Sequence, residues 1–350
     1  MRAIHRRPII VSVSLVAAFA FAGLAAAPQT IKEGDWPQWR GPQRNSISTE
    51  TGLLDKWPDD GPPLLWTAKK LGPGLSSVTL QGGHIYTMGE RGDEQIVICM
   101  NSEGGDEIWS TPIGKKWSPH NDDPGPRCIP AADGDLVYAL GSDGDLVCLE
   151  TATGKVHWKL NFQKDFGGKR PHWGFTESPL VDGDWLLCTP GGKEAMMVAL
   201  NKLTGETIWK CAVPEFGKGG GDGAAYSSIV VSDAAGVKQY VQLIGHGLIG
   251  VAAADGKFLW GYNRIANGTA NIPTPIIRGD YVFDSTGYGT GAALVKLSKD
   301  GDDVKAEEIY FLKGDVLQNH HGGMVLVGDY LYGGHGNNQG APICLEFLTG

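Results

Sequence analysis

Leu-Glu-Thr-Ala-Thr-Gly-Lys-Val-His-Trp, residues 149–158, is the stretch of this chain that decides its fold. A glycine followed four residues later by a tryptophan recurs at Gly105–Trp109, Gly154–Trp158, Gly205–Trp209 and Gly256–Trp260. The steps from one tryptophan to the next are 49, 51 and 51 residues. A period of about 50 residues is typical of repeat architectures, in which each unit buries its apolar face against its neighbours. The chain is therefore expected to form one structure built from similar units.

Each repeat carries four strand signals joined by tight turns. In the third repeat these signals lie at 178–181, 185–189, 196–200 and 207–211. We count six repeats, which begin near Ser76, Arg127, Glu177, Tyr226, Ile272 and His321. The fifth is irregular, with an acidic insertion over 300–308 and Tyr310 in place of the tryptophan. Four antiparallel strands per unit at this spacing predict an all-β fold, a β-propeller of four-stranded blades.

A tryptophan at one fixed position of each repeat favours a structural role for that side chain. We expect these residues to dock between neighbouring blades, as a large aromatic side chain can. They are Trp66, Trp109, Trp158, Trp209 and Trp260.

Trp66 ends an isolated fourth-strand signal, 63–66, that no earlier strand precedes. This strand either completes the last blade and closes a six-bladed ring, or belongs to a larger ring. An open ring would expose strand edges, which proteins avoid. The last residues, 348–350, also lie in a turn that leads toward another strand. We therefore expect six visible blades of a seven- or eight-bladed ring, truncated at the C-terminus.

The first 27 residues have the pattern of a signal peptide. A region with three arginines precedes an uncharged apolar run, 9–24, and small residues follow at 25–27. No cysteine follows the run, so a lipoprotein anchor is not indicated, and a retained membrane anchor is the alternative. The mature protein is expected in the periplasm or secreted, with no integral membrane span after cleavage. The expected segments are a signal peptide over 1–27, an N-terminal extension over 28–62 and a propeller over 63–350.

The charge of the chain argues against two classes of partner. The formal net charge is −9, and loss of the three arginines of the signal peptide makes it more negative. Nucleic-acid binding needs clustered Lys and Arg, and docking on anionic lipid needs a basic patch. We expect neither partner.

The cysteines follow the repeat instead of forming obvious pairs. Cys99, Cys148 and Cys344 occupy one position of their repeats, which Ala199 and Val251 fill in the third and fourth. This position suits a small apolar residue, and cysteine can serve as one. Equivalent positions of different repeats lie too far apart for a disulfide. We expect mostly free, buried thiols.

The pattern Leu-Glu-x-x-Thr-Gly-Lys-x-x-Trp at 149–158, with its copies, resembles the tryptophan-docking repeat of propellers of the pyrroloquinoline-quinone (PQQ) type. The resemblance covers about residues 63–350, and that superfamily includes quinoprotein alcohol dehydrogenases and the outer-membrane assembly factor BamB. Asp-Trp-Pro-Gln-Trp-Arg-Gly-Pro at 35–42 resembles the start of secreted PQQ-like repeat proteins of planctomycete-type bacteria. The resemblance implies either a binding and assembly scaffold or an oxidoreductase.

As a family, quinoprotein dehydrogenases stack the quinone on a tryptophan, cover it with a disulfide between adjacent cysteines, bind Ca²⁺ through Glu and Asn, and use an Asp as base. This chain has no Cys-Cys pair, and Trp173 with Glu177 is its nearest approach to that set. PQQ with Ca²⁺ is therefore kept as an alternative cofactor, without residues assigned to it. The chain also lacks the lipidation cysteine expected of the assembly factor, so the resemblance does not fix an assembly role.

Polar and aromatic residues precede the innermost strand of five repeats. Because these segments are equivalent, their side chains should converge around the propeller axis and form a binding site, or else line a water-filled channel. The candidates for this central funnel are Arg127, Trp173, Glu177, Tyr226, Asn271, His320 and His321. No metal site is expected, because adjacent histidines on a strand point to opposite faces.

These observations favour an exported propeller that acts as a non-catalytic binding or assembly scaffold. It would present its funnel and loops to a small ligand or a protein partner. A PQQ-dependent dehydrogenase that oxidises alcohols or sugars is the alternative. A third class, a carbohydrate-binding or polymer-degrading accessory protein, is permitted by the aromatic loop residues but not indicated by them.

Overall fold

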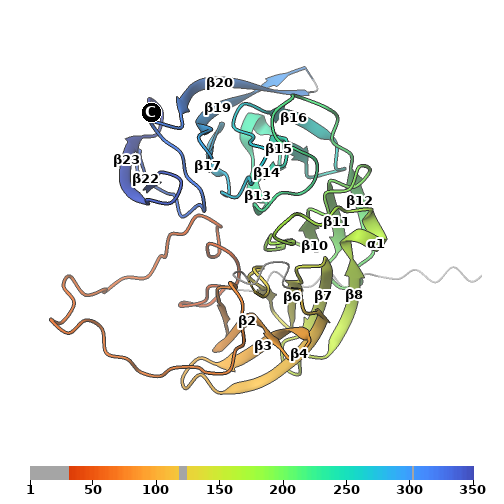
Figure 1. Cartoon of the computed structure of the whole chain (residues 1–350), viewed down its shortest axis with the longest axis vertical. Helices are drawn as coiled ribbons and strands as arrows, with labels where there is room; N and C mark the ends of the chain where they lie inside the picture. Colours follow the sequence, from red (N-terminus) through yellow and green to blue (C-terminus); the bar gives the residue numbers. More distant parts are fainter. Residues whose placement is uncertain (1–30, 118–123, 302) are drawn as a thin grey trace, which may run out of the picture.

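The computed structural model describes residues 31–117, 124–301 and 303–350, and the predicted signal peptide lies outside this part of the chain. The described residues form five four-stranded sheets and one three-stranded sheet. Every sheet is an antiparallel meander whose strands follow one another in chain order. Figure 1 shows the sheets arranged around a central axis. The prediction of an all-β propeller is confirmed.

The blades follow the predicted repeats. The first blade holds β1 (Thr79–Gln81), β2 (His84–Arg91), β3 (Glu94–Asn101) and β4 (Glu107–Lys115). The second holds β5 (Ala131–Asp133), β6 (Leu136–Leu140), β7 (Asp145–Glu150) and β8 (Val156–Asn161), followed by a short helix, α1 (Phe162–Phe166). The third holds β9 (Leu180–Asp182), β10 (Trp185–Cys188), β11 (Met197–Asn201) and β12 (Thr207–Cys211).

The second half of the chain continues this arrangement. The fourth blade holds β13 (Val230–Ser232), the turn η1 (Ala234–Gly236), β14 (Gln239–Ile244), β15 (Gly247–Ala252) and β16 (Phe258–Tyr262). The fifth holds β17 (Ile276–Arg278), β18 (Tyr281–Thr286), β19 (Gly291–Asp300) and β20 (Asp303–Lys313), so the acidic insertion lengthens its outer hairpin. The sixth holds β21 (Val325–Val327), β22 (Tyr330–His335) and β23 (Ala341–Glu346).

The blades are held together by the repeated Gly and Trp. The ring of Trp109 lies on Gly154 of the next blade, where an added Cβ would be 2.5 Å from the ring. Its indole N–H donates to the carbonyl of Thr151 at 2.8 Å. Trp158 and Trp209 make the equivalent bonds to the carbonyls of the following blades. Glycine is required in these turns because φ is positive and the ring leaves no room for a side chain.

Trp66 and Tyr310 make similar docking contacts at the first blade and in the fifth blade. The ring of Trp66 lies on Gly105 of the first blade, although the predicted strand at 63–66 is not formed. That strand prediction was wrong: Leu64 and Leu65 are exposed and join no sheet. Tyr310 takes the place of the tryptophan in the fifth blade, and its hydroxyl donates to the carbonyl of Phe347 at 2.8 Å.

Trp260 departs from the predicted docking contact. It packs among apolar residues of the fourth and fifth blades, but its indole N–H donates to Gln239 of its own blade at 2.6 Å. The long β19–β20 hairpin replaces the Thr-Gly turn on which its ring would dock. The ring instead covers Gly250, which pairs with Trp260 in the sheet. Gly250, not Val251, therefore occupies the position that cysteine fills in other blades.

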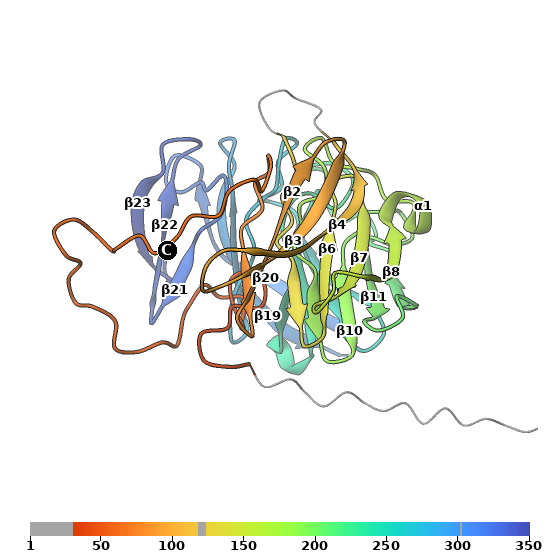
Figure 2. The same cartoon turned by 90° about the horizontal axis from the view of Figure 1, so that it is seen from below.

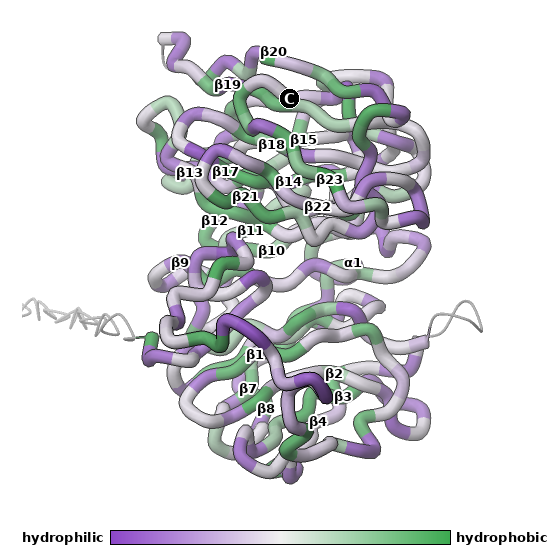
Figure 3. The backbone as a smooth tube through the Cα atoms, turned by 90° about the vertical axis from the view of Figure 1, so that its left-hand side faces the viewer, coloured by the Kyte–Doolittle hydropathy of each residue, from purple (hydrophilic) through white to green (hydrophobic). Residues whose placement is uncertain are grey.

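The apolar cores join residues of neighbouring sheets. In Figure 3 the hydrophobic residues follow the strands, and hydrophilic residues gather at the turns. All six cysteines are free thiols, and five of them are buried, as expected. Cys344, in the sixth blade, is exposed. In the part of the chain that the structure describes, no helix is long and apolar enough to cross a bilayer.

The residues that precede the first blade form two parts with different environments. Trp36 pairs with Leu80 of β1 through two backbone hydrogen bonds, and residues 37–46 then lie near the axis of the ring (Figure 2). Residues 47–75 cross the space between the sixth and first blades (Figure 1). This crossing segment carries exposed Leu53, Leu54 and Trp57. The number of blades in the complete ring stays a prediction.

Candidate functional site

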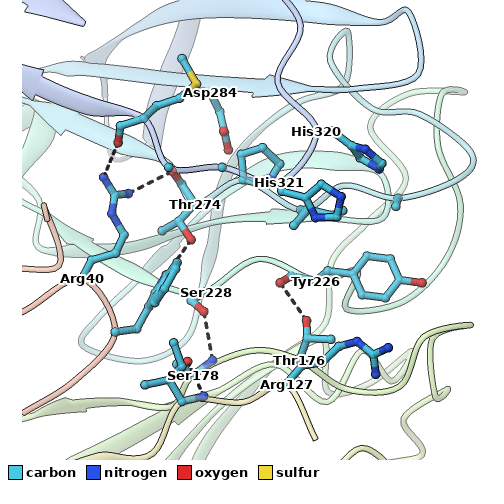
Figure 4. Close-up of a pocket in the computed structure, with 18 of the residues that line it drawn as sticks. Arg40, Arg127, Thr176, Ser178, Tyr226, Ser228, Thr274, Asp284, His320 and His321 are labelled. Carbon is cyan, nitrogen blue, oxygen red and sulfur yellow. Dashed lines mark hydrogen bonds between the residues drawn. The ribbon is translucent and has the colours of Figure 1, made fainter. Parts of the chain in front are cut away.

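A cavity of about 560 Å³ lies on the central axis of the propeller. Its wall is built from the segments that enter the inner strands of all six blades, and from Trp39 and Arg40 of the N-terminal extension. Figure 4 shows Arg40 and Asp284 at one end, and Arg127, Tyr226 and His320 at the other. We call the first end the floor and the second end the mouth.

The floor is closed by the N-terminal extension. Arg40 is buried, and its guanidinium donates to the carbonyls of Thr274 at 3.4 Å and Met324 at 2.8 Å, in the fifth and sixth blades. Its Nε donates to the hydroxyl of Ser46 at 2.9 Å. The indole of Trp39 donates to the Thr274 hydroxyl at 3.1 Å. These bonds fix one side of the floor to two blades.

Arg44, which does not line the cavity, holds the same segment to two further blades. Its guanidinium donates to the carbonyl of Ile229 at 2.5 Å and to those of Ser178 and Pro179 at 2.8 and 2.7 Å. The planar fork of arginine suits several acceptors at once. Burial lowers the pKa of Arg44 to about 10, and the nearby carboxyl of Glu177 opposes that shift. Residues 36–46, which we call the plug, therefore join the third to sixth blades across the axis.

The inner strands are also tied to one another below the mouth. The hydroxyl of Ser178 accepts a hydrogen bond from the backbone N–H of Ile129 at 3.1 Å. The hydroxyl of Ser228 accepts one from the N–H of Ser178 at 3.0 Å. Each bond joins one blade to the next at equivalent positions of the repeat, so the cavity wall is preorganised.

Five of the seven predicted funnel residues line the cavity. They are Arg127, Trp173, Tyr226, His320 and His321. The rings of Trp173 and Tyr226 meet edge to face with centroids 5.6 Å apart. Tyr288 was not predicted from the sequence. Its hydroxyl oxygen lies 2.7 Å from the Nε2 of His320. The mouth is therefore lined by aromatic rings and by the guanidinium of Arg127.

The other two predicted residues, Glu177 and Asn271, do not line the cavity. Glu177 is buried behind the wall, where it accepts a hydrogen bond from the N–H of Thr189 at 2.5 Å, and burial raises its pKa to about 7. Asn271 donates to the carbonyls of Ile244 and Gly245. In extended chain, alternate residues point to opposite sides, so the neighbours of Glu177 face the cavity instead.

Asp284, in the middle of β18, is a lining residue that the sequence analysis missed. Its side chain is buried, with the residue 2% exposed. One carboxyl oxygen accepts from the N–H of Ser285 at 2.8 Å, and the other has no hydrogen-bond partner. Burial raises the pKa of Asp284 well above its usual value, and the charge of Arg40 opposes that shift. The available signal was one acidic residue inside the strand Tyr-Val-Phe-Asp-Ser-Thr.

The described part of the chain contains no group of three or more His, Cys, Asp or Glu side chains placed to hold a metal ion. Asp284 is the single carboxylate among the residues that line the cavity in the described structure. The chemistry that the lining offers is therefore hydrogen bonding and aromatic contact, with two arginines near opposite ends.

A comparison with protein families places this fold more closely. The model of the family described as outer membrane protein assembly factor BamB matches residues 92–350, more than half of the chain. This chain belongs to that family. The BamB-like assignment agrees with the resemblance seen in the repeated Gly-Trp pattern. A comparison with curated proteins finds no match.

Solved structures with the same fold include a BamB and two enzymes. BamB from Moraxella catarrhalis is 13% identical with a TM-score of 0.54, over 81% of this chain and 75% of that one. A quinohemoprotein alcohol dehydrogenase from Pseudomonas putida HK5 is 17% identical with a TM-score of 0.51, over 89% of this chain and 51% of that one. The corresponding enzyme from Comamonas testosteroni is 16% identical with a TM-score of 0.50, over 89% and 52%. This chain spans about half the length of the two enzymes, and these similarities show the propeller fold alone.

Proposed function

We propose that this BamB-like propeller is a non-catalytic binding scaffold, exported to the periplasm or secreted, that holds a small ligand in its central cavity. The observation that carries the proposal is the cavity itself, bounded at the floor by Trp39 and Arg40 of the plug and lined at the mouth by aromatic side chains. Ligand sites are typically concave, mostly apolar and provided with a few well-placed polar groups. The loops around the mouth remain available for a protein partner.

The preorganisation of the wall supports binding over a solvent channel. Trp39 and Arg40 bound the floor of the cavity, and the hydrogen bonds of Arg40 and Arg44 with carbonyls of the third to sixth blades hold the plug in place. The serine hydroxyls fix the spacing of the second, third and fourth blades. A rigid site loses less conformational freedom when a ligand binds, which favours affinity.

The alternative, a PQQ-dependent dehydrogenase, requires a different set of residues. Ca²⁺ takes six to eight oxygen ligands, several of them usually carboxylates. The cavity lining of the described structure supplies one carboxylate, Asp284, and Glu177 is turned away behind the wall. The residues present do not fit a quinone held through Ca²⁺. The titration with PQQ in the next paragraph tests this alternative directly.

The proposal predicts that Trp173→Ala weakens ligand binding at least about tenfold, because a stacking surface at the mouth is lost. The mature protein would be titrated by calorimetry with neutral disaccharides, and with PQQ in the presence and absence of Ca²⁺. Trp57→Ala is the matched control, since Trp57 is 60% exposed and does not line the cavity. Saturable binding that Trp173→Ala alone weakens supports the scaffold.

Two results would contradict it. Reduction of an electron-accepting dye by the PQQ-loaded protein, in the presence of an alcohol or sugar, would establish the dehydrogenase instead. Binding that Trp173→Ala leaves unchanged would place the ligand outside the cavity.

A further inference from the structure

Asp284 lines the cavity, and its carboxyl group is only partly hydrogen-bonded. One of its oxygens has no partner, although the residue is 2% exposed and lines the floor. Leaving a buried polar atom without a hydrogen-bond partner is energetically unfavourable. Because Asp284 lines the cavity, a bound molecule can supply the missing partner.

The neighbouring groups of the protein do not supply it. Arg40 lies near enough to affect Asp284 electrostatically, but its guanidinium donates to the carbonyls of Thr274 and Met324. No ion pair joins Arg40 and Asp284 within the described structure. The N–H of Ser285 donates a hydrogen bond to the other carboxyl oxygen of Asp284. The protein therefore leaves this buried oxygen of a cavity-lining residue without a partner, and a ligand that packs against the floor can supply one.

The charges around the cavity narrow the class of that ligand. A cationic amine at the floor would meet the positive charge of Arg40. Burial raises the pKa of Asp284, which favours the neutral carboxyl, a group that both donates and accepts a hydrogen bond. A hydroxyl has the same double capacity. The floor therefore suits a neutral hydroxylated group better than a cation.

The mouth suits the rest of such a molecule. Trp173, Tyr226 and Tyr288 present aromatic rings, and the apolar faces of a sugar ring can pack against them. The cavity of about 560 Å³ lies within the range of small-molecule sites. We propose that the ligand is a neutral sugar, a free saccharide or the end of a glycan, whose hydroxyl is anchored by Asp284. This inference rests on the proposed function and names the ligand class of the same cavity.

The test is an array of neutral and acidic glycans probed with the mature protein, followed by calorimetry with the neutral glycans that bind. Asp284→Leu keeps a similar shape and removes both hydrogen-bonding capacities, and we expect it to weaken binding roughly tenfold to hundredfold. Asp284→Asn keeps a donor and an acceptor and should retain most of the affinity. Glu177→Gln changes a buried carboxyl outside the lining and should leave affinity unchanged.

A stability measurement separates anchoring from a structural role. Asp284→Leu removes the unpartnered oxygen but also takes the acceptor from the N–H of Ser285, so the melting temperature of the unliganded variant should change little while binding falls. An array with no neutral glycan bound overturns the sugar proposal. Full affinity in Asp284→Leu also overturns it, and if Trp173→Ala still weakens binding, the cavity remains the site. Binding that both variants leave intact contradicts the proposed function as well.

Discussion

Replacing Trp209 with alanine is expected to lower the free energy of unfolding by about 3–5 kcal/mol, as large-to-small substitutions of buried aromatic residues do. Trp209 is 8% exposed and packs in the core shared by the third and fourth blades, with Ile249 and Val251. Its ring covers Gly256, and its indole N–H donates to the carbonyl of Ala253 at 3.2 Å. The substitution therefore leaves both a cavity and an unpartnered carbonyl between two blades.

Urea denaturation followed by circular dichroism would measure this loss. Trp57→Ala is the control, because Trp57 is 60% exposed and belongs to the segment 47–75 between the sixth and first blades. We expect the control to change stability by less than about 0.5 kcal/mol. Equal stabilities of the two variants would mean that the repeated tryptophan does not hold the blades together.

Replacing Arg44 with methionine is expected to cost about 3 kcal/mol or more. The variant keeps much of the apolar stem but leaves the buried carbonyls of Ser178, Pro179 and Ile229 without their donor. Each unsatisfied buried group costs about 1–3 kcal/mol. Since Arg44 joins the plug to the third and fourth blades, its loss should also loosen the C-terminal part of the plug around Arg44, while Trp36 and Arg40 still hold the rest.

Thermal melting and limited proteolysis would follow these two effects. Arg91→Met is the matched control, because Arg91 pairs with Glu107 in a half-exposed ion pair on the first blade. Exposed ion pairs contribute about 0–1 kcal/mol, so this variant should melt near the wild type. If Arg44→Met melts with the control and its plug resists protease, the plug is not held by Arg44.

The repeated features of the fold could be predicted because they occur many times. A Gly-to-Trp spacing found four times fixes both the blade and its docking contact, and Tyr310 could be placed by its register. The exception, Trp260, depends on one glycine, Gly250, and on one long hairpin, β19–β20. Neither feature recurs along the sequence, so the repeat pattern does not predict the different contact of Trp260.

The candidate site was predicted only in part, for a related reason. The segments that converge on the axis could be named, but the side that each residue faces depends on alternation within them, which separates Ser178 from Glu177. Arg40 and Arg44 lie in a segment with no repeat, and two arginines near the N-terminus indicate a solvated surface in most chains. Asp284 is one acidic residue within an apolar strand, and only the surrounding packing shows that it meets a cavity.

The central claim is that the plug closes the propeller axis and forms the floor of a binding cavity. Hydrogen–deuterium exchange of the native protein tests it most directly, because the amides of Trp36, Gly41, Arg44 and Ser46 are hydrogen-bonded in the structure. We predict that peptides covering 36–46 exchange slowly, at rates near those of the inner strands, whereas peptides covering 47–75 exchange fast. Rapid exchange over 36–46, equal to that of 47–75, would contradict a closed floor.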